Sequence, residues 1–103
     1  MDEREYQARL GKIREEIDAI DGQLLPLFLR RMAGTEQVAQ VKQEAGAPVF
    51  SAPREQAILD RVRSQAGEEG NAAAALYASI MAISRDKQYR LLQRGAPLRQ
   101  LEK

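Results

Sequence analysis

The sequence predicts an all-α protein of three helices, the first of them very long. Three observations support this fold class. Straight-chain helix formers are plentiful, while aromatic residues make up only 5% of the 103 residues. Apolar residues in the first 44 positions recur at steps of three and four, as on one face of a helix. Two segments rich in Gly and Pro, 46–53 and 67–70, divide the remainder into helix-sized pieces.

The first helix is expected to run from about Glu5 to Glu44. Its apolar stripe contains Leu10, Ile13, Ile17, Ile20, Leu24, Leu27, Val38 and Val41. Forty residues form a rod of about 60 Å, whereas a domain of this size has a radius of gyration of about 13 Å. Because two shorter helices cannot cover so long a stripe, we expect a homodimer. Pro26 should bend this helix without ending it, since the stripe continues beyond it.

The later boundaries follow from capping residues. Ser51 is expected to cap the second helix, with Pro53 in its first turn, where a missing N–H donor costs nothing. That helix should end near Gly67. Asn71 is expected to cap the third helix, and Gly95 to end it. Residues 1–95 would then form one domain, followed by a tail at 96–103.

Composition excludes several classes of protein. The net charge of +1, from 16 basic and 15 acidic residues, argues against a nucleic-acid or membrane partner. No segment has the roughly 18 apolar residues of a membrane span, and no signal peptide is evident, so we expect a cytoplasmic protein. The chain has no His and no Cys. We therefore expect no metal site, and chemistry limited to carboxylates, Lys, Arg, hydroxyls and amides.

Polar residues interrupt the apolar faces of all three predicted helices. The heptad steps after Leu27 reach Arg31, whose guanidinium is costly to bury without an anion. Ser84 and Gln88 interrupt an apolar face of the third helix at i, i+4 spacing. Glu55 shares a face with the apolar residues of the second helix. Each residue alone also fits an ordinary role, as a solvated cation, a satisfied polar pair or a complement to the helix dipole.

Helical geometry relates the cations of the first helix. Lys42 lies about 20° around the helix from Arg31 and about 16 Å along it, while Arg14 is about 25 Å from Arg31 in the other direction. If two such helices pair antiparallel about Leu24 and Leu25, Arg14 of one chain approaches Arg31 and Lys42 of the other. This arrangement suits a small dianion and chemistry without a covalent step.

The ordered set of motifs resembles the all-helical chorismate mutases. The matching segments, from about Leu10 to Leu92, are Ile13-Arg14-Glu-Glu-Ile17-Asp18, Leu29-Arg30-Arg31-Met32, Val38-Ala-Gln-Val41-Lys42, Pro48-Val49, Arg54-Glu55 and Ile80-Met-Ala-Ile83-Ser84-Arg85-Asp-Lys-Gln88. The resemblance implies an intertwined homodimer with two equivalent sites. It also implies rearrangement of chorismate to prephenate, a step of phenylalanine and tyrosine biosynthesis.

By matching position, the resemblance assigns the carboxylates of chorismate to Arg31 and to Arg14 from across the dimer interface. Ser84 and Arg54 would assist this binding. Planar guanidinium forks suit carboxylates because they donate two parallel hydrogen bonds.

The resemblance further implies that Lys42 and Gln88 face the ether oxygen whose bond breaks, and that Glu55 holds the ring hydroxyl. Many relatives have an aspartate where this chain has Ser51, so Ser51 is expected to assist at the hydroxyl or to cap the helix. The rearrangement is unimolecular and pericyclic, so it requires no cofactor. Catalysis would come from orientation and from charge stabilisation at the ether oxygen.

Two other functions are compatible with the sequence. An isochorismate–pyruvate lyase would share the fold and much of the cationic pocket. A helical interaction module would use the long helix only to dimerise, and would tolerate Leu at Arg31. A DNA-binding dimer fits less well, because the net charge is near zero. The sequence also leaves open fusion to other enzymes of aromatic biosynthesis.

Overall fold

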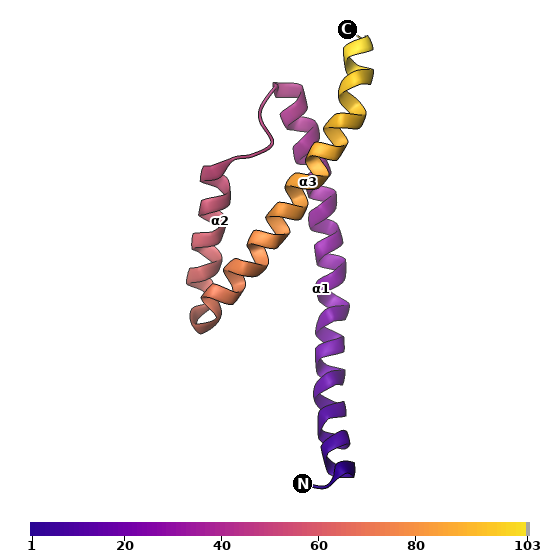
Figure 1. Ribbon diagram of the computed structural model, residues 1–103, viewed down its shortest axis with the longest axis vertical. Helices are drawn as coiled ribbons and strands as arrows, with labels where there is room; N and C mark the ends of the chain where they lie inside the picture. Colours follow the sequence, from indigo (N-terminus) through magenta and orange to yellow (C-terminus); the bar gives the residue numbers. More distant parts are fainter. Residues whose placement is uncertain (103) are drawn as a thin grey trace. The chain divides into compact units, whose positions relative to one another are not determined.

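The computed structural model describes the backbone of residues 1–102 and the side chains of residues 1–92. Within these residues it contains helices and no strand, which confirms the all-α prediction. The elements are α1 (Glu3–Ala45), α2 (Ala52–Gln65), the short 3-10 helix η1 (Gly67–Glu69) and α3 (Gly70–Glu102). The three α-helices are labelled in Figure 1. The chain divides into two compact units, Met1–Ala33 and Gly34–Lys103.

The unit of residues 1–33 is a helix with an apolar stripe at its surface. Its first turn is capped by Asp2, whose carboxylate accepts a hydrogen bond of 2.7 Å from the backbone N–H of Glu5. The helix continues through Pro26, as expected, because the neighbouring helix formers maintain the pattern. Ile17 is 50% exposed and Ile20 60% exposed. A stripe of this kind normally faces a partner surface.

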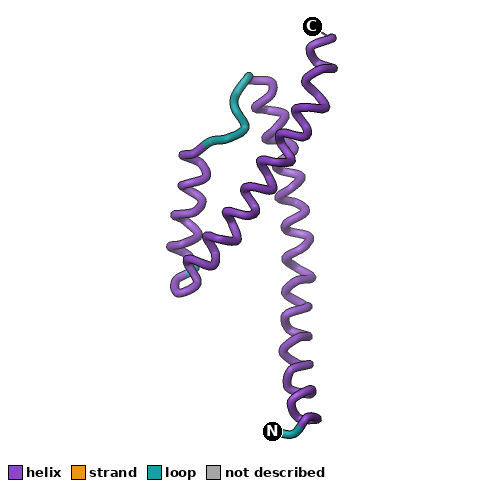
Figure 2. Tube along the Cα trace, viewed as in Figure 1, coloured by secondary structure: helices purple, strands orange, loops and turns teal. Residues whose placement is uncertain are grey.

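The loop between α1 and α2, teal in Figure 2, follows from two local signals. Gly46 adopts a φ of 69°, a left-handed conformation that ends α1. The N–H of Ala47 then donates to the carbonyl of Lys42 at 2.8 Å. Ser51 is the N-cap of α2, because its hydroxyl accepts from the N–H of Arg54 at 3.4 Å. Pro53 lies in the first turn, so the predicted start of the second helix is confirmed.

Helices α2 and α3 pack against each other as a hairpin joined by η1. Ile58, Val62 and Met81 form the buried core of this hairpin, and Leu59 and Tyr77 pack against it. These residues recur every three or four positions along α2 and α3, so one face of each helix is buried. The hairpin core therefore fixes the register in which the polar residues of the two helices meet.

Two predicted boundaries of the third helix are wrong. Asn71 does not cap α3, because the 3-10 turn leads directly into the helix and Gly70 already has helical angles, φ −55° and ψ −44°. Gly95 does not end α3, which continues to Glu102. A single glycine disfavours a helix by only about 1 kcal/mol, which neighbouring helix formers can offset.

Candidate active site

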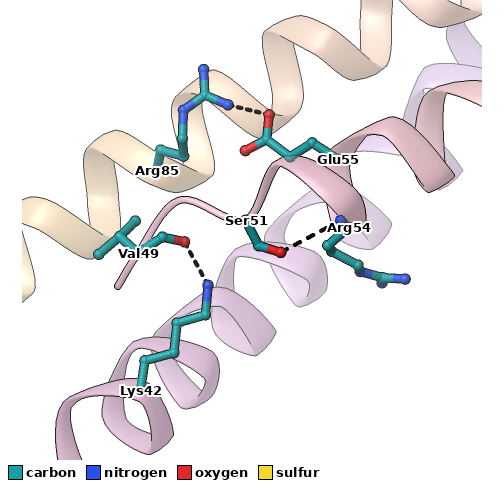
Figure 3. A network of polar contacts seen from close by, with 6 residues as sticks. All are labelled: Lys42, Val49, Ser51, Arg54, Glu55 and Arg85. Atoms are coloured by element: carbon teal, nitrogen blue, oxygen red, sulfur yellow. Dashed lines mark hydrogen bonds and ion pairs between the residues drawn. The ribbon is translucent and has the colours of Figure 1, made fainter. Parts of the chain in front are cut away.

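The site lies in the unit of residues 34–103, where the end of α1, the loop and the start of α2 come close to the middle of α3. Lys42, in the last turn of α1, is partly buried. Its ammonium donates a hydrogen bond of 2.5 Å to the carbonyl of Val49, as Figure 3 shows. Among the described residues, no carboxylate lies within ion-pair distance of Lys42. Lys42 is thus a cation held in place by a backbone carbonyl, with no neutralising side chain in the described part of the chain.

Two polar residues of α3 are buried on its inner face, as the sequence predicted. Ser84 and Gln88 are each 7% exposed. The hydroxyl of Thr35, also buried, donates a hydrogen bond of 3.3 Å to the hydroxyl of Ser84, which ties α1 to α3. The side-chain oxygen of Gln88 is buried and has no hydrogen-bond partner within the described part of the chain. A buried acceptor of this kind costs about 1–3 kcal/mol, and a ligand or second chain can supply its donor.

The first turn of α2 brings a carboxylate to α3. Glu55 forms an ion pair with Arg85, drawn in Figure 3. The Arg85 guanidinium also lies 5.5 Å from the centroid of the Phe50 ring, a cation–π distance. Ser51 and Arg54 belong to the same segment: Ser51 is half-buried and holds the Arg54 backbone, while the Arg54 side chain is exposed.

The remaining two predicted site residues belong to the other unit. Arg14 is exposed on α1, and Arg31 is partly buried. The structure therefore brings six predicted site residues into one unit: Lys42, Ser51, Arg54, Glu55, Ser84 and Gln88. Of these, Lys42, Ser84 and Glu55 contact neighbouring elements of that unit through hydrogen bonds or an ion pair. The roles predicted for Arg14 and Arg31 stay predictions.

The charge distribution in the unit of residues 34–103 is uneven. Arg85 is paired with Glu55, and Lys87 with Glu36 at 2.9 Å, so those cations are locally balanced. Lys42 has no such carboxylate partner among the described residues. A partly buried, uncompensated ammonium favours an anionic ligand.

The functional groups of the site also limit the reactions that it can catalyse. Within the described residues, no cluster of three His, Cys, Asp or Glu side chains could hold a metal ion. None of the helices in this part of the chain combines the length and apolar character needed to cross a bilayer. The site offers an ammonium, a hydroxyl, an amide and a carboxylate, without a nucleophile–base pair. The fold and site thus define an all-α protein suited to binding and orienting a small anion.

Thr35 and Arg85 were not predicted from the sequence as site residues. The predicted apolar stripe runs from Leu27 through Arg31 to Val38, whereas the buried residues of α1 are Thr35 and Ala39. The buried face of α1 could have been found from the spacing of Thr35, Ala39 and Lys42, which are four and then three residues apart. Arg85 had no comparable signal, since its role depends on Glu55, which is distant in the sequence.

Comparison with known proteins gives the family. Residues 13–89 match the model of the chorismate mutase type II family, which covers well over half of the chain. The chain therefore belongs to this family, and the resemblance found in the motifs is confirmed. No solved structure matches the chain significantly.

Three curated relatives indicate the range of the family. The chain is 38% identical over 55 residues to a chorismate mutase of Methanocaldococcus jannaschii, covering 53% of this chain and 56% of the relative. It is 35% identical over 68 residues to a T-protein of Haemophilus influenzae, covering 66% of this chain and 18% of that protein. It is 33% identical over 64 residues to a 4-amino-4-deoxychorismate mutase of Streptomyces venezuelae, covering 62% of each. The chain thus spans less than two thirds of each of these relatives.

Proposed function

We propose that this chain is a chorismate mutase, which rearranges chorismate to prephenate in phenylalanine and tyrosine biosynthesis. The observation that carries the proposal is the partly buried Lys42 ammonium, which meets a backbone carbonyl and no carboxylate within the described residues. The buried amide of Gln88 supports it, because its oxygen has no hydrogen-bond partner within the described residues, and buried polar groups are normally completed by a ligand, a water or another polar group. Membership of the chorismate mutase type II family supports the choice of reaction.

Orientation of the substrate is the first part of the proposed mechanism. Arg31 and Arg14 of the partner subunit bind the two carboxylates, and Arg54 and Ser84 assist. Fixing both carboxylates selects the chair-like diaxial conformer, in which the two reacting carbons are close. Holding a flexible molecule in its reactive geometry lowers the barrier because the entropy of orientation is lost on binding rather than in the reaction.

Charge stabilisation is the second part. In one concerted step the C–O bond of the ether breaks and a new C–C bond forms, so no proton or electron leaves the substrate. Negative charge grows on the ether oxygen as its bond lengthens. Lys42 can donate to that oxygen while keeping its bond to the Val49 carbonyl, since an ammonium has three donors. The Gln88 amide supplies the second donor after orienting its N–H₂ toward the oxygen.

Recognition of the substrate ring is assigned to the start of α2. One oxygen of Glu55 is paired with Arg85, and the other makes no hydrogen bond within the described residues. That second oxygen can accept a hydrogen bond from the ring hydroxyl. Ser51 caps α2 and thereby fixes the first turn that carries Glu55. In this chain Ser51 caps the helix at the position where many relatives have an aspartate.

We further propose that the enzyme is an intertwined homodimer. The apolar stripe of α1 supports this, because Ile13, Leu24 and Leu27 are each 54% exposed in the single chain. An antiparallel pairing centred near Leu24 and Leu25 would bury the stripe and present Arg14 to the other subunit. Residues 1–95 would form the catalytic domain, a range that includes the whole family match, and residues 96–103 a C-terminal tail.

The test is an assay of the purified chain with chorismate. Loss of chorismate absorbance, with prephenate identified as the product, is the expected result. Lys42→Ala should lower kcat by about 10²–10³-fold, the usual effect of removing one donor to a developing oxyanion. Arg61→Ala removes an equal charge from an exposed position of α2 and should leave kcat unchanged.

Two results would overturn the proposal. Pyruvate release from isochorismate without chorismate turnover would assign the chain as a lyase. Absence of turnover with both substrates, from a folded dimer, would assign it as an interaction module. Equal activity of the wild type and Lys42→Ala would remove Lys42 from the site even if chorismate is the substrate.

A further inference from the structure

Arg85 is held by two contacts next to the proposed ring-recognition group. Its guanidinium pairs with one oxygen of Glu55 and lies over the Phe50 ring at 5.5 Å (Figure 3 draws the pair). The side chains of Arg85 and Glu55 are 31% and 20% exposed, so the pair is partly removed from water. A positive charge held in this way has a fixed place, unlike that of a solvated surface arginine.

The pair changes what Glu55 can recognise. A lone carboxylate attracts any cation, and would hold a substrate ammonium more strongly than a neutral hydroxyl. A carboxylate already paired with a guanidinium offers its second oxygen as an acceptor, with its charge largely balanced. The hydrogen bond from a neutral hydroxyl to this oxygen is weakened little when the charge of the carboxylate is balanced. An ammonium at the same place loses much of its attraction and meets the positive charge of Arg85.

We propose that Arg85 is a specificity-determining residue, which admits a hydroxyl and rejects an ammonium at the ring position that Glu55 contacts. The inference rests on the proposed function and names the substrate class of the same site. The relevant competitor is 4-amino-4-deoxychorismate, in which an amino group replaces the ring hydroxyl. Primary amines carry a proton at neutral pH, so this analogue presents an ammonium to Glu55.

The test compares kcat/KM for chorismate and for 4-amino-4-deoxychorismate in the purified full chain. The wild type should prefer chorismate. Arg85→Met removes the charge and keeps an unbranched apolar stem that can cover the Phe50 ring. This variant should shift the ratio of the two kcat/KM values toward the amino substrate by on the order of tenfold, the size of a like-charge contact at partial burial. Arg85→Lys keeps the charge and should retain most of the wild-type preference.

A second measurement on the wild type separates charge from shape. The preference for chorismate should weaken as ionic strength rises, because salt screens the repulsion between the ammonium and Arg85. It should also weaken as the pH rises and the substrate amine loses its proton. Both readouts are ratios between substrates, so a change in overall activity cancels. They also serve as the test if Arg85→Met does not fold.

The outcomes distinguish this inference from the function on which it rests. A wild type without activity on chorismate would refute both. An active wild type in which Arg85→Met lowers both kcat/KM values equally would leave the mutase assignment intact and make Arg85 a structural residue. A ratio independent of salt and pH would equally contradict the charge-based account.

Discussion

The buried amide of Gln88 leads to opposite predictions for stability and for activity. Its oxygen has no hydrogen-bond partner within the described residues, and the side chain is 7% exposed. Gln88→Met replaces the amide by an unbranched apolar side chain of similar volume, so the packing of α3 should change little. Removing the unsatisfied acceptor should raise the free energy of unfolding by about 1 kcal/mol, and by no more than about 3 kcal/mol.

The same substitution removes the donor proposed to face the ether oxygen. Turnover of chorismate should therefore fall by about 10²–10³-fold while the protein becomes more stable. Urea denaturation followed by circular dichroism, at one fixed protein concentration, measures the stability change. Gln65→Met, at an exposed position near the end of α2, is the matched control and should change neither quantity appreciably. A destabilised Gln88→Met, or one with normal turnover, would refute the reasoning.

Three further predictions concern the stability of the fold. Gly70→Ala should destabilise the protein by about 1–3 kcal/mol, because its Cβ would lie 2.8 Å from the backbone carbonyl oxygen of Arg63. Gly11→Ala in α1, whose Cβ would have no atom within 4 Å, should instead stabilise it by about 0.5–1 kcal/mol in the same urea denaturation experiment, and a loss of stability there would contradict the account. Thr35→Val should lower the free energy of unfolding by about 1 kcal/mol, because it removes a buried hydrogen bond to Ser84; unchanged stability would show that this bond contributes nothing.

Local signals predicted most of the fold. The length of α1, its end before Gly46 and the Ser51 cap depend on neighbouring residues in the sequence, so these features could be predicted. The two boundary errors arose where context overrides a local preference. Gly70 is required by its close approach to Arg63, and this contact between segments carries no local signal.

The candidate site was predictable in part. Ser84 and Gln88 stood out because each interrupts an apolar face, and the structure buries both. Glu55 was found for the same reason, but its partner Arg85 was not, because the ion pair joins two helices whose register is set by the core between them. Thr35 was missed because the predicted inner face of α1 was displaced by one residue along the helix. Contacts between elements are the part that periodicity alone does not determine.

The central claim is that each site combines Lys42 from one subunit with Arg14 from the other. Mixing two inactive variants, Arg14→Ala and Lys42→Ala, after unfolding and refolding them together tests it directly. In a mixed dimer one site has both residues intact and the other has neither. Random pairing at equal amounts should restore about a quarter of the wild-type activity. Activity no higher than that of the separate variants would show that Arg14 and Lys42 do not act together across a subunit interface.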